Sequence, residues 1–512
     1  MIRQQTIAAN SSSENNGCRS EIHAGIRPRL TPDLPVVTTF ASAIQYLTTL
    51  TNVETLRPSH VDKSTVFRLD RMTALVRVLG DPQASFRSVH VAGSKGKGSV
   101  CEMTAAALAG CGFTVGVFTS PHLVDIRERI RINSEPIGQM PFARLISKVS
   151  TAAASLPQRL GDVTAFEALT AAAFVYFAQE AVDVAVIEVG LGGTTDATNV
   201  ITPVVSAITA IQMEHSQLLG PTLADIARHK AGIIKPGVPV VTVPQCEEVL
   251  AVFRESAALA AAPLRVLGAD MEFSSRFEST PDLGPHMRVC LTGERGCFDH
   301  LAVPLLGEHQ ASNCGVALAI LDSLRSSGMH ISDADVAAGL RLTSRAGRLE
   351  RIHDDPRIYV DGAHNPESIH ALMKSLGAYI TYDSVVVVFG CAADKDVAGM
   401  LAKLATGADK VFFTAAEGSD RAIDPRELQR KFSEVSTKMS QVTPTLKEAI
   451  NAAARAVSKG DIVLVTGSFL LAGEAKRLFA GKAEREAKVE IAARAEVKAR
   501  PADPPKPSKP QS

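Results

Sequence analysis

A glycine-rich stretch that contains two lysines is the clearest chemical signal in the chain. It runs from His90 to Ser99 as HVAGSKGKGS, with an apolar run before it and a good helix former, 102–109, after it. A strand, a glycine-rich turn with a lysine and then a helix present backbone N–H groups and a helix N-terminus to phosphate. The stretch therefore predicts a nucleotide phosphate site formed by the loop residues Gly93, Ser94, Lys95, Gly96, Lys97, Gly98 and Ser99.

This loop lacks one of the usual Mg²⁺ ligands of a nucleotide-binding loop. Gly98 follows Lys97 where a regular Walker A loop has Ser or Thr, so some of the Mg²⁺ ligands must come from other segments. Three residues that follow apolar strands are the candidates: Ser120, Glu188 and His215. Each alone is more typical of a cap, a solvated side chain or a core histidine. Their joint occurrence with a phosphate loop in one sheet favours a metal and nucleotide site.

Two further cationic residues, Lys230 and Arg348, have either a structural or a functional interpretation. Lys230, in HKAGIIKPG, ends a predicted helix, which favours a lysine that complements the helix dipole. Arg348, in GRLE, falls in a predicted linker, where it either reaches a phosphate or is solvated.

The segment DGAHNP places an acid, an imidazole and an amide where a strand ends and a helix begins. Asn365 before Pro366 is explained by helix capping. Capping does not explain Asp361 and His364, so these two are candidate functional residues.

The elements that must position these residues alternate between apolar strands and helices. Such alternation indicates a parallel sheet covered on both faces, with polar residues at the carboxyl ends of its strands forming the site. The predicted strands are 113–118, 182–189, 204–211 and 238–243, and the predicted helices are 39–50, 67–79, 165–179 and 221–230. The charged segment with Arg127, Glu128 and Arg129 is predicted to be a functional loop.

A second α/β series follows. We expect an antiparallel insertion at 263–303, a helix at 310–326, a linker near 344–351, and strands at 358–361, 384–389, 410–414 and 462–466. At 512 residues the chain is too long for one ordinary core. The predicted division is a disordered tail (1–35), a first α/β domain (36–345), a smaller α/β domain (346–480), and a frayed helix with a disordered tail (481–512).

Composition narrows the class of protein. Apolar residues make up 46% and charged residues 21% of the chain, and the formal net charge is zero, which gives no electrostatic case for nucleic acid. The eight cysteines form no CxxC pair, so reduced thiols in the cytoplasm are expected. No apolar run predicts a membrane span or a signal peptide.

The motifs occur in a characteristic order: HVAGSKGKGS, TSPHL, IEVGLGGTTDATNV, EHSQLLG, HKAGIIKPG, GEHQASN, GRLE, DGAHNP, DKD and TGSFLLAGE. This order, over residues 40 to 480, resembles the folylpolyglutamate synthase and dihydrofolate synthase family within the Mur ligase superfamily. The resemblance implies a P-loop ATPase domain followed by a smaller Rossmann-like domain. It also implies an ATP-dependent ligase, with the bifunctional form favoured, in which a dihydropteroate or reduced folate carboxyl is phosphorylated and glutamate then attacks the acyl phosphate.

The resemblance also implies a role for each candidate. Lys97 and its loop would hold the ATP phosphates, and Ser120, Glu188 and His215 would ligate one or two Mg²⁺. Lys230 would be carbamylated, which replaces the dipole interpretation. Gln310 and Asn313 would lie near adenine, Arg348 on phosphate, Asp361 near the nucleotide and His364 beside the incoming amino acid. The loop 120–129 would border the folate site, and a monomer with small-molecule partners is expected.

The chain departs from the family pattern at several positions: Lys95 for Asn, Thr194 for Arg, Glu214 for Asp, His229 for Glu, and Arg345-Ala346 for Trp-Pro. These departures remove no expected metal or phosphate ligand. Three alternatives stay open: another Mur-type amino-acid ligase, a nucleotide-binding protein that has lost ligation, and a simple P-loop kinase.

Overall fold

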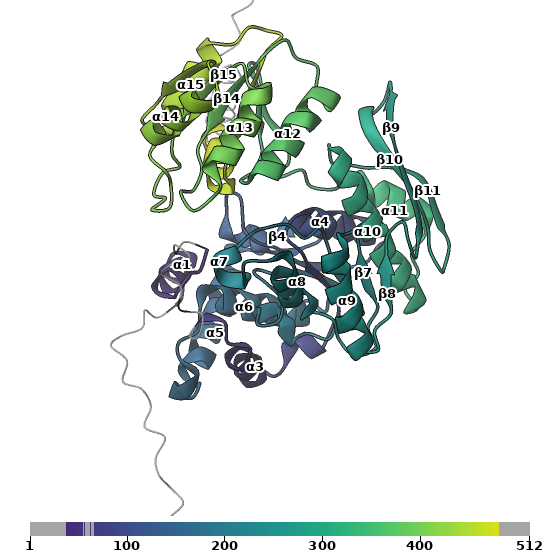
Figure 1. Ribbon diagram of the computed structural model, residues 1–512. Coiled ribbons are helices and arrows are strands. Elements are labelled where there is room, and N and C mark those ends of the chain that lie inside the picture. The colour runs from purple at the N-terminus through teal and green to yellow at the C-terminus, as the bar shows by residue number, and fades with distance from the viewer. Residues whose placement is uncertain (1–36, 55, 57–61, 63–65, 481–512) are drawn as a thin grey trace, which may run out of the picture. The chain divides into compact units, whose positions relative to one another are not determined.

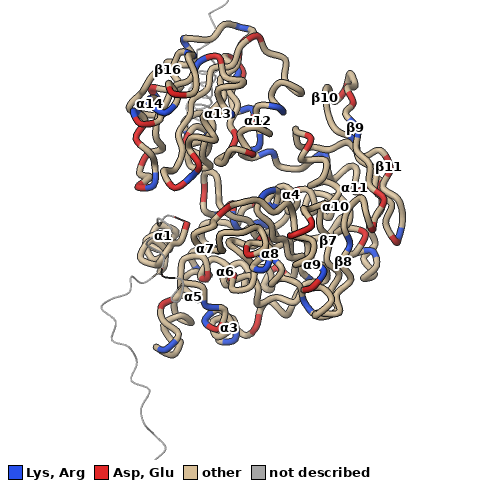
Figure 2. Tube along the Cα trace, viewed as in Figure 1, with Lys and Arg blue, Asp and Glu red and all other residues tan. Residues whose placement is uncertain are grey.

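The computed structural model describes residues 37–480 apart from 55, 57–61 and 63–65. All of the described residues belong to one compact unit. The predicted tails 1–35 and 481–512 lie outside the described residues. Within the described ranges, none of the helices combines the length and the apolar content needed to cross a bilayer. In the view of Figure 2, cationic and anionic residues are interspersed along the described chain, in keeping with its zero net charge.

The first sheet has the strand order β4-β3-β2-β5-β1-β6-β7-β8 (Figure 1). Six of its strands are parallel: β2 (Val115–Phe118), β5 (Val184–Glu188), β1 (Arg87–Ala92), β6 (Val205–Ile208), β7 (Val240–Thr242) and β8 (Leu264–Val266). The first five were predicted, whereas β8 was expected to belong to an antiparallel insertion. Two short strands, β3 (Ile130–Ile132) and β4 (Glu135–Pro136), extend one edge in antiparallel fashion.

Alternate residues of each strand face two different helical layers, as the two-residue period of a strand requires. Val184 and Val186 of β5 pack with the layer of α4 (Lys97–Gly110), α10 (Glu308–Ser326) and α11 (Asp333–Leu340). Ala185 and Ile187 pack with the layer of α1 (Phe40–Thr49), α3 (Leu69–Val78), α5 (Gln139–Ala154) and α6 (Ala165–Gln179). Ile208 and Val240 pack with the helices α8 (Leu223–Ala231) and α9 (Glu247–Leu259).

Most predicted helices are confirmed, α6 with the predicted bounds, but two helix starts were wrong and three helices, α5, α9 and α11, were not predicted. Helix α4 begins at Lys97, so the glycine loop runs directly into it. Helix α8 begins after Thr222, whose side chain forms a capping box with Asp225, and Pro221 precedes that cap. Helix α5 follows the charged loop and was not predicted, although its buried residues recur at helical spacing.

The antiparallel insertion is confirmed in a shorter form. Strand β8 joins the parallel sheet, and the insertion consists of β9 (Glu272–Thr280), β10 (Gly284–Thr292) and β11 (Cys297–Ala302).

The second sheet has the order β12-β13-β17-β14-β15-β16. Its strands are β12 (Glu350–Asp354), β13 (Arg357–Val360), β17 (Ile462–Thr466), β14 (Val385–Phe389), β15 (Lys410–Phe413) and β16 (Met439–Val442). Only β12 is antiparallel to its neighbour. One face packs on α12 (Pro366–Tyr379), α13 (Val397–Gly407) and α14 (Pro425–Val435), and the other on α15 (Leu446–Arg455).

A buried ion pair joins α3 to α6. Arg71 Nε lies 3.0 and 2.9 Å from the two carboxylate oxygens of Glu167, and the side chains are only 2% and 5% exposed. Glu167 also accepts a hydrogen bond from the backbone N–H of Thr164 at 2.8 Å. Burial raises the pKa of Glu167, although Arg71 opposes that rise. The carboxylate therefore depends on its arginine partner to remain ionised.

We expect Arg71→Met to lower the free energy of unfolding by about 3–5 kcal/mol, because it leaves a buried carboxylate without its partner. Arg68→Met is the matched control: Arg68 pairs with Asp70, which is 55% exposed, and its loss should cost under about 1 kcal/mol. Denaturant unfolding measures both, and the double variant Arg71→Met/Glu167→Gln should recover part of the loss. Equal effects of the two single variants would contradict this assignment.

Candidate active site

The carboxyl ends of the first sheet open onto a cavity of about 1280 Å³ that residues of the second sheet also line. Parallel strands direct the loops after them to one edge, which is where α/β folds form their sites. All predicted site residues except Gly93 and Lys230 line this cavity: Ser94, Lys95, Gly96, Lys97, Gly98, Ser99, Ser120, Glu188, His215, Gln310, Asn313, Arg348, Asp361 and His364.

The start of α4 offers backbone donors to this cavity. The first helical hydrogen bond runs from Val100 N–H to Gly96 O at 2.9 Å. The N–H groups of Lys97, Gly98 and Ser99 precede that bond and thus have no partner within the helix. The N–H groups of Ser94 and Lys95 instead donate to Ala210 O at 3.0 and 3.2 Å, which fixes the loop to the segment after β6. The anion-binding donors are therefore those of the helix start.

One glycine of the loop is required by a close approach. Gly93 has φ +145°, and a Cβ there would lie 1.8 Å from Thr209 Oγ1. A Cβ on Gly98 would lie 2.3 Å from a terminal nitrogen of Arg348. The Arg348 guanidinium therefore lies beside the start of α4, next to the position where a Walker A loop would carry a hydroxyl.

Two lysines converge on one carbonyl oxygen. Lys97 Nζ lies 3.2 Å and Lys230 Nζ 2.7 Å from Gly93 O. Lys230 is in the last turn of α8 and is 4% exposed, yet its ammonium contacts the phosphate loop, 137 residues away, and not the end of its own helix. Burial, reinforced by the Lys97 charge, lowers the pKa of Lys230 to about 7. A substantial neutral fraction of this amine therefore exists near neutral pH.

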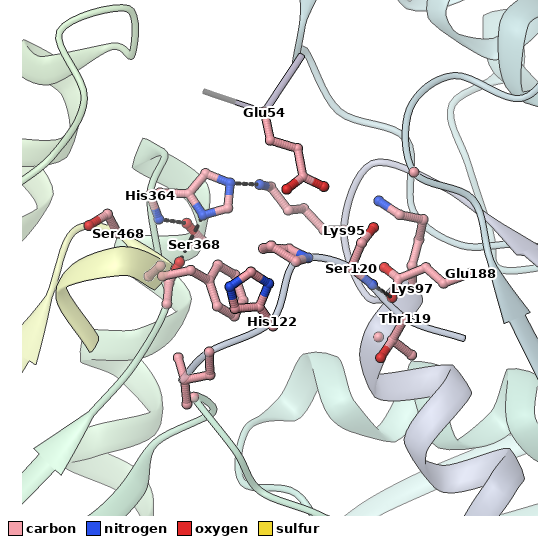
Figure 3. A pocket seen from close by; sticks show the side chains of 18 of the residues that line it. Glu54, Lys95, Lys97, Thr119, Ser120, His122, Glu188, His364, Ser368 and Ser468 are labelled. Carbon is pink, nitrogen blue, oxygen red and sulfur yellow. Dashed lines mark hydrogen bonds between the residues drawn. The ribbon is translucent and has the colours of Figure 1, made fainter. Parts of the chain in front are cut away.

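Two of the three candidate metal ligands, Ser120 and Glu188, are in direct contact. The backbone N–H of Ser120 donates to Glu188 Oε2 at 3.1 Å, and Glu188 is 4% exposed (Figure 3). Burial raises the pKa of Glu188, and the Lys97 charge opposes the rise. Burial lowers the pKa of His215 to about 3, so its imidazole is neutral at pH 7.

This donor set suits Mg²⁺ bound together with a nucleotide. The described part of the chain contains no cluster of three His, Cys, Asp or Glu side chains that could hold a metal alone. Mg²⁺ in phosphate-transfer sites usually takes one or two carboxylates, substrate phosphate oxygens and water. Glu188 and the Ser120 hydroxyl fit this pattern, whereas the His215 nitrogen is the less typical ligand.

A three-membered polar cluster joins segments from both sheets. Lys95 Nζ lies 2.9 Å from His364 Nε2 (Figure 3). Glu214 Oε1 lies 2.7 Å from Lys95 Nζ and 3.0 Å from His364 Nε2. A second ammonium, that of Lys395, lies 3.8 Å from the same carboxylate oxygen. Burial acts to raise the pKa of Glu214, but Lys95 and His364 outweigh it and hold that pKa well below its usual range. Burial and the Lys95 charge lower the pKa of His364.

Asp361 fastens the segment that carries Arg348. Its carboxylate oxygens accept hydrogen bonds from Leu349 N–H and Ala363 N–H, both at 2.8 Å. Burial raises the pKa of Asp361 to about 6, against these two hydrogen bonds. The geometry thus gives Asp361 a role in holding the 347–349 turn at the cavity wall, in addition to its place on that wall.

Gln310 and Asn313 are on α10, one turn apart. They are 5% and 6% exposed, and Asn313 Nδ2 donates to Gln310 Oε1 at 2.9 Å. A Cβ on Gly96 would lie 2.3 Å from Asn313 Oδ1, so this pair packs directly on the phosphate loop.

Of the residues in the cavity wall, His122 and Arg129 lie within the predicted loop 120–129 but were given no individual role, and their partner Glu54 was missed. Arg129 Nε donates to His122 Nδ1 at 2.9 Å, and Arg129 forms a two-pronged ion pair with Glu54. The only sequence signal was the charged loop itself, because its partner Glu54 is 75 residues away. The departure Thr194 is outside the cavity lining, and its hydroxyl donates to His229 O at 3.1 Å.

Two known domain families match the chain, one over the first sheet and one over the second. The Mur ligase middle domain matches residues 91–321, and the Mur ligase glutamate ligase domain matches residues 347–469.

Whole-chain relatives carry related names. The chain is 37% identical over 420 residues to folylpolyglutamate synthase of Lacticaseibacillus casei, covering 80% of this chain and 94% of the relative. It is 35% identical over 441 residues to dihydrofolate synthase/folylpolyglutamate synthase of Mycobacterium tuberculosis, covering 80% and 90%. Among solved structures, Mycobacterium tuberculosis folylpolyglutamate synthase complexed with ADP has a TM-score of 0.77 at 32% identity and covers 87% of this chain and 99% of its own. E. coli FolC in complex with DHPP and ADP has a TM-score of 0.75 at 27% identity, with 88% and 99% covered.

We expect Lys95→Met to raise the pKa of His364. The substitution removes a cation 2.9 Å from Nε2 and leaves the Glu214 carboxylate, which favours the imidazolium form. NMR titration of carbon-13-labelled histidine measures the shift, with His364→Gln to assign the signal. Lys395→Met is the control and should give a smaller rise, because this lysine is 3.8 Å from Glu214. An unchanged or lowered pKa in Lys95→Met would refute the electrostatic assignment.

Proposed function

Because this chain belongs to the folylpolyglutamate synthase and dihydrofolate synthase family of the Mur ligases, and is therefore an ATP-dependent ligase, we propose that it joins L-glutamate to dihydropteroate and to reduced folates. One observation carries the proposal: the phosphate loop and His364 line one cavity although they belong to different sheets. A kinase needs the first of these alone, whereas a ligase must bring an amine to the acyl group that has been phosphorylated.

The reaction then has two balanced steps. A carboxylate oxygen of the acceptor attacks the γ-phosphorus of ATP, and the bond to the β-phosphate oxygen breaks to release ADP. The amine nitrogen of glutamate attacks the acyl carbon, the carbon–oxygen bond to phosphate breaks, and the amine loses its proton. The cavity must exclude water in between, since hydrolysis of the acyl phosphate would waste ATP.

The phosphate loop holds ATP in this scheme. Lys97, Arg348 and the N–H groups at the start of α4 offset the charge on the β- and γ-phosphates. Glu188 and Ser120, with His215 as the third candidate, are the residues that would hold Mg²⁺. When bound, the metal supplies charge neutralisation and orientation of the phosphoryl group. Gln310 and Asn313, packed on Gly96, are our candidates for the adenine side.

Lys230 is proposed to be carbamylated. A neutral lysine amine adds to CO₂, forming a nitrogen–carbon bond and releasing a proton. The pKa of about 7 supports this, because the neutral form is the reactive one. The product is an anion beside Lys97, which would relieve the repulsion between two ammonium groups on Gly93 O.

His364 is proposed to lie beside the incoming amine, and Asp361 to keep Arg348 and its turn at the nucleotide. We place the division between the ATPase part and the glutamate-ligating part at 345/346. We further propose a cytoplasmic monomer whose partners are small molecules.

The test is a pair of parallel assays with dihydropteroate and with a reduced folate as acceptor. Release of ADP that requires ATP, Mg²⁺ and glutamate, together with a glutamylated product, is expected with both. Product with one acceptor only would restrict the proposal to a single reaction. ATP binding without a product from either would refute it, as would phosphate retained on the acceptor. A product with peptidoglycan precursors alone would favour another Mur-type ligase.

Lys97→Ala is expected to abolish ADP release, since it removes the cation that faces the transferred phosphoryl group. A loss of at least about 10³-fold in kcat follows from the usual contribution of such a cation. Lys235→Ala is the control, because Lys235 Nζ donates to Asn199 O and is outside the cavity lining. Wild-type turnover in Lys97→Ala would exclude this role.

Lys230→Ala is expected to lose most activity and to regain part of it when a short carboxylic acid is added, because the acid replaces the carbamate anion. Wild-type activity should fall as pH drops below 7, where Lys230 becomes protonated and unreactive toward CO₂. A carbamate signal from carbon-13 bicarbonate, present in the wild type and lost in the variant, measures the modification directly. No signal and no rescue would refute carbamylation.

A further inference from the structure

The loop after β2 holds His122 rigidly at the cavity. The Glu128 carboxylate accepts hydrogen bonds from three successive N–H groups, including those of Leu123 at 2.8 Å and Asp125 at 2.9 Å. Leu123 is 8% exposed and packs among residues of the second sheet. A Cβ on Gly473 would lie 1.8 Å from Leu123 O, so the two segments are in direct contact. His122 is therefore presented by a preorganised turn.

The hydrogen bond from Arg129 selects the tautomer of His122. Arg129 Nε lies 2.9 Å from His122 Nδ1, and a guanidinium can only donate. Nδ1 must therefore carry the lone pair, which puts the ring proton on Nε2. Arg129 is itself fixed, since it is 5% exposed at the side chain and donates with both terminal nitrogens to Glu54.

The His122 side chain lines the same cavity as the phosphate loop and His364. In the view of Figure 3, the His122 ring lies between Lys97, Ser120 and Glu188 on one side and His364 and Ser368 on the other. In the proposed reaction the acyl phosphate extends through this cavity, between the phosphate donor and the amine. Within the described residues, Nδ1 has a protein partner and no hydrogen bond from Nε2 to the protein is found.

We propose that His122 donates its Nε2–H hydrogen bond to the acyl oxygen of the acceptor substrate, with Arg129 and Glu54 as positioning residues. When the amine attacks, the acyl carbon–oxygen double bond opens and negative charge gathers on that oxygen. The Nε2–H donor stabilises the charge, the bond to phosphate then breaks, and the double bond re-forms. No proton moves to or from His122. This role rests on the proposed ligase reaction.

Substitutions of His122 test whether the position of its N–H donor matters, or only the size of the side chain. Glutamine places an amide N–H near the position of Nε2, whereas asparagine places it near Nδ1. We expect His122→Ala and His122→Asn to lower kcat by about 10²–10³-fold, as the loss of one oxyanion donor does, and His122→Gln to stay within about tenfold of the wild type. The KM for ATP should be unchanged. His353→Gln, a histidine outside the cavity lining, is the control.

The tautomer itself is measured by nitrogen-15 NMR of the imidazole, which distinguishes a protonated from an unprotonated ring nitrogen. His122 should show an unprotonated Nδ1 and a protonated Nε2, and Arg129→Met should mix the two tautomers. Arg325→Met is the matched control: the Arg325 side chain is 11% exposed and paired with the more exposed Asp333 outside the cavity lining, so it tests the effect of losing an arginine–carboxylate pair on its own.

The outcomes distinguish this role from the ligase reaction. Absence of ligation in the wild type would overturn both. Ligation in the wild type with equal rates in the glutamine, asparagine and alanine variants, or a protonated Nδ1, would overturn the role of His122 alone. Recovery in His122→Gln only, together with the Nε2–H tautomer, is the result expected.

Discussion

The carbonyl oxygen of Gly93 is the point on which the site depends. It accepts from both Lys97 and Lys230, and it can do so only because Gly93 has no side chain to meet Thr209. Helix α4 follows this glycine, with Gly96 as its N-cap, and its first N–H groups have no partner within the helix and can bind phosphate. The carbonyl of Gly93 also brings two lysine amines to one atom. Burial, together with this crowding, lowers the pKa of Lys230.

The second sheet completes the site through contacts distant in sequence. His364 meets Lys95 across 269 residues, and the Arg348 guanidinium lies beside Gly98 at the start of α4. Asp361 accepts a hydrogen bond from the backbone N–H of Leu349, directly after Arg348, and a second from Ala363 N–H. The lysine at 95 and the longer acid at 214 depart from the family pattern together and contact each other at 2.7 Å. Together they span the distance from the phosphate loop to His364.

Local patterns in the sequence predicted the elements well, because apolar strands between helices bury both faces of a parallel sheet. The bounds of α6 and the polar residues after β1, β2, β5 and β6 followed from periodicity alone. Helix α5 was missed since the charged residues before it suggested a loop, although Phe142, Leu145, Ile146 and Val149 carry the helical spacing. Burial of Lys230 and the chain from Glu54 to His122 could not be predicted locally. Both features depend on which loops contact one another in the fold. For Lys230, only the family resemblance indicated a role other than complementing the helix dipole.

The charged side chains around the cavity affect both the binding of a nucleotide and the protonation state of an amine. Lys95, Lys97, Arg348 and Lys395 line the cavity, and Lys230 contacts the phosphate loop from outside the cavity lining. A polyanionic nucleotide would offset the charge of these cations, and its binding would stabilise the folded protein by mass action. Lys95 and Lys395 both lie near the Glu214 carboxylate that contacts His364. An amine at the proposed position beside His364 would therefore meet two ammonium groups and one carboxylate, a balance that favours its neutral form, the form able to attack an acyl phosphate.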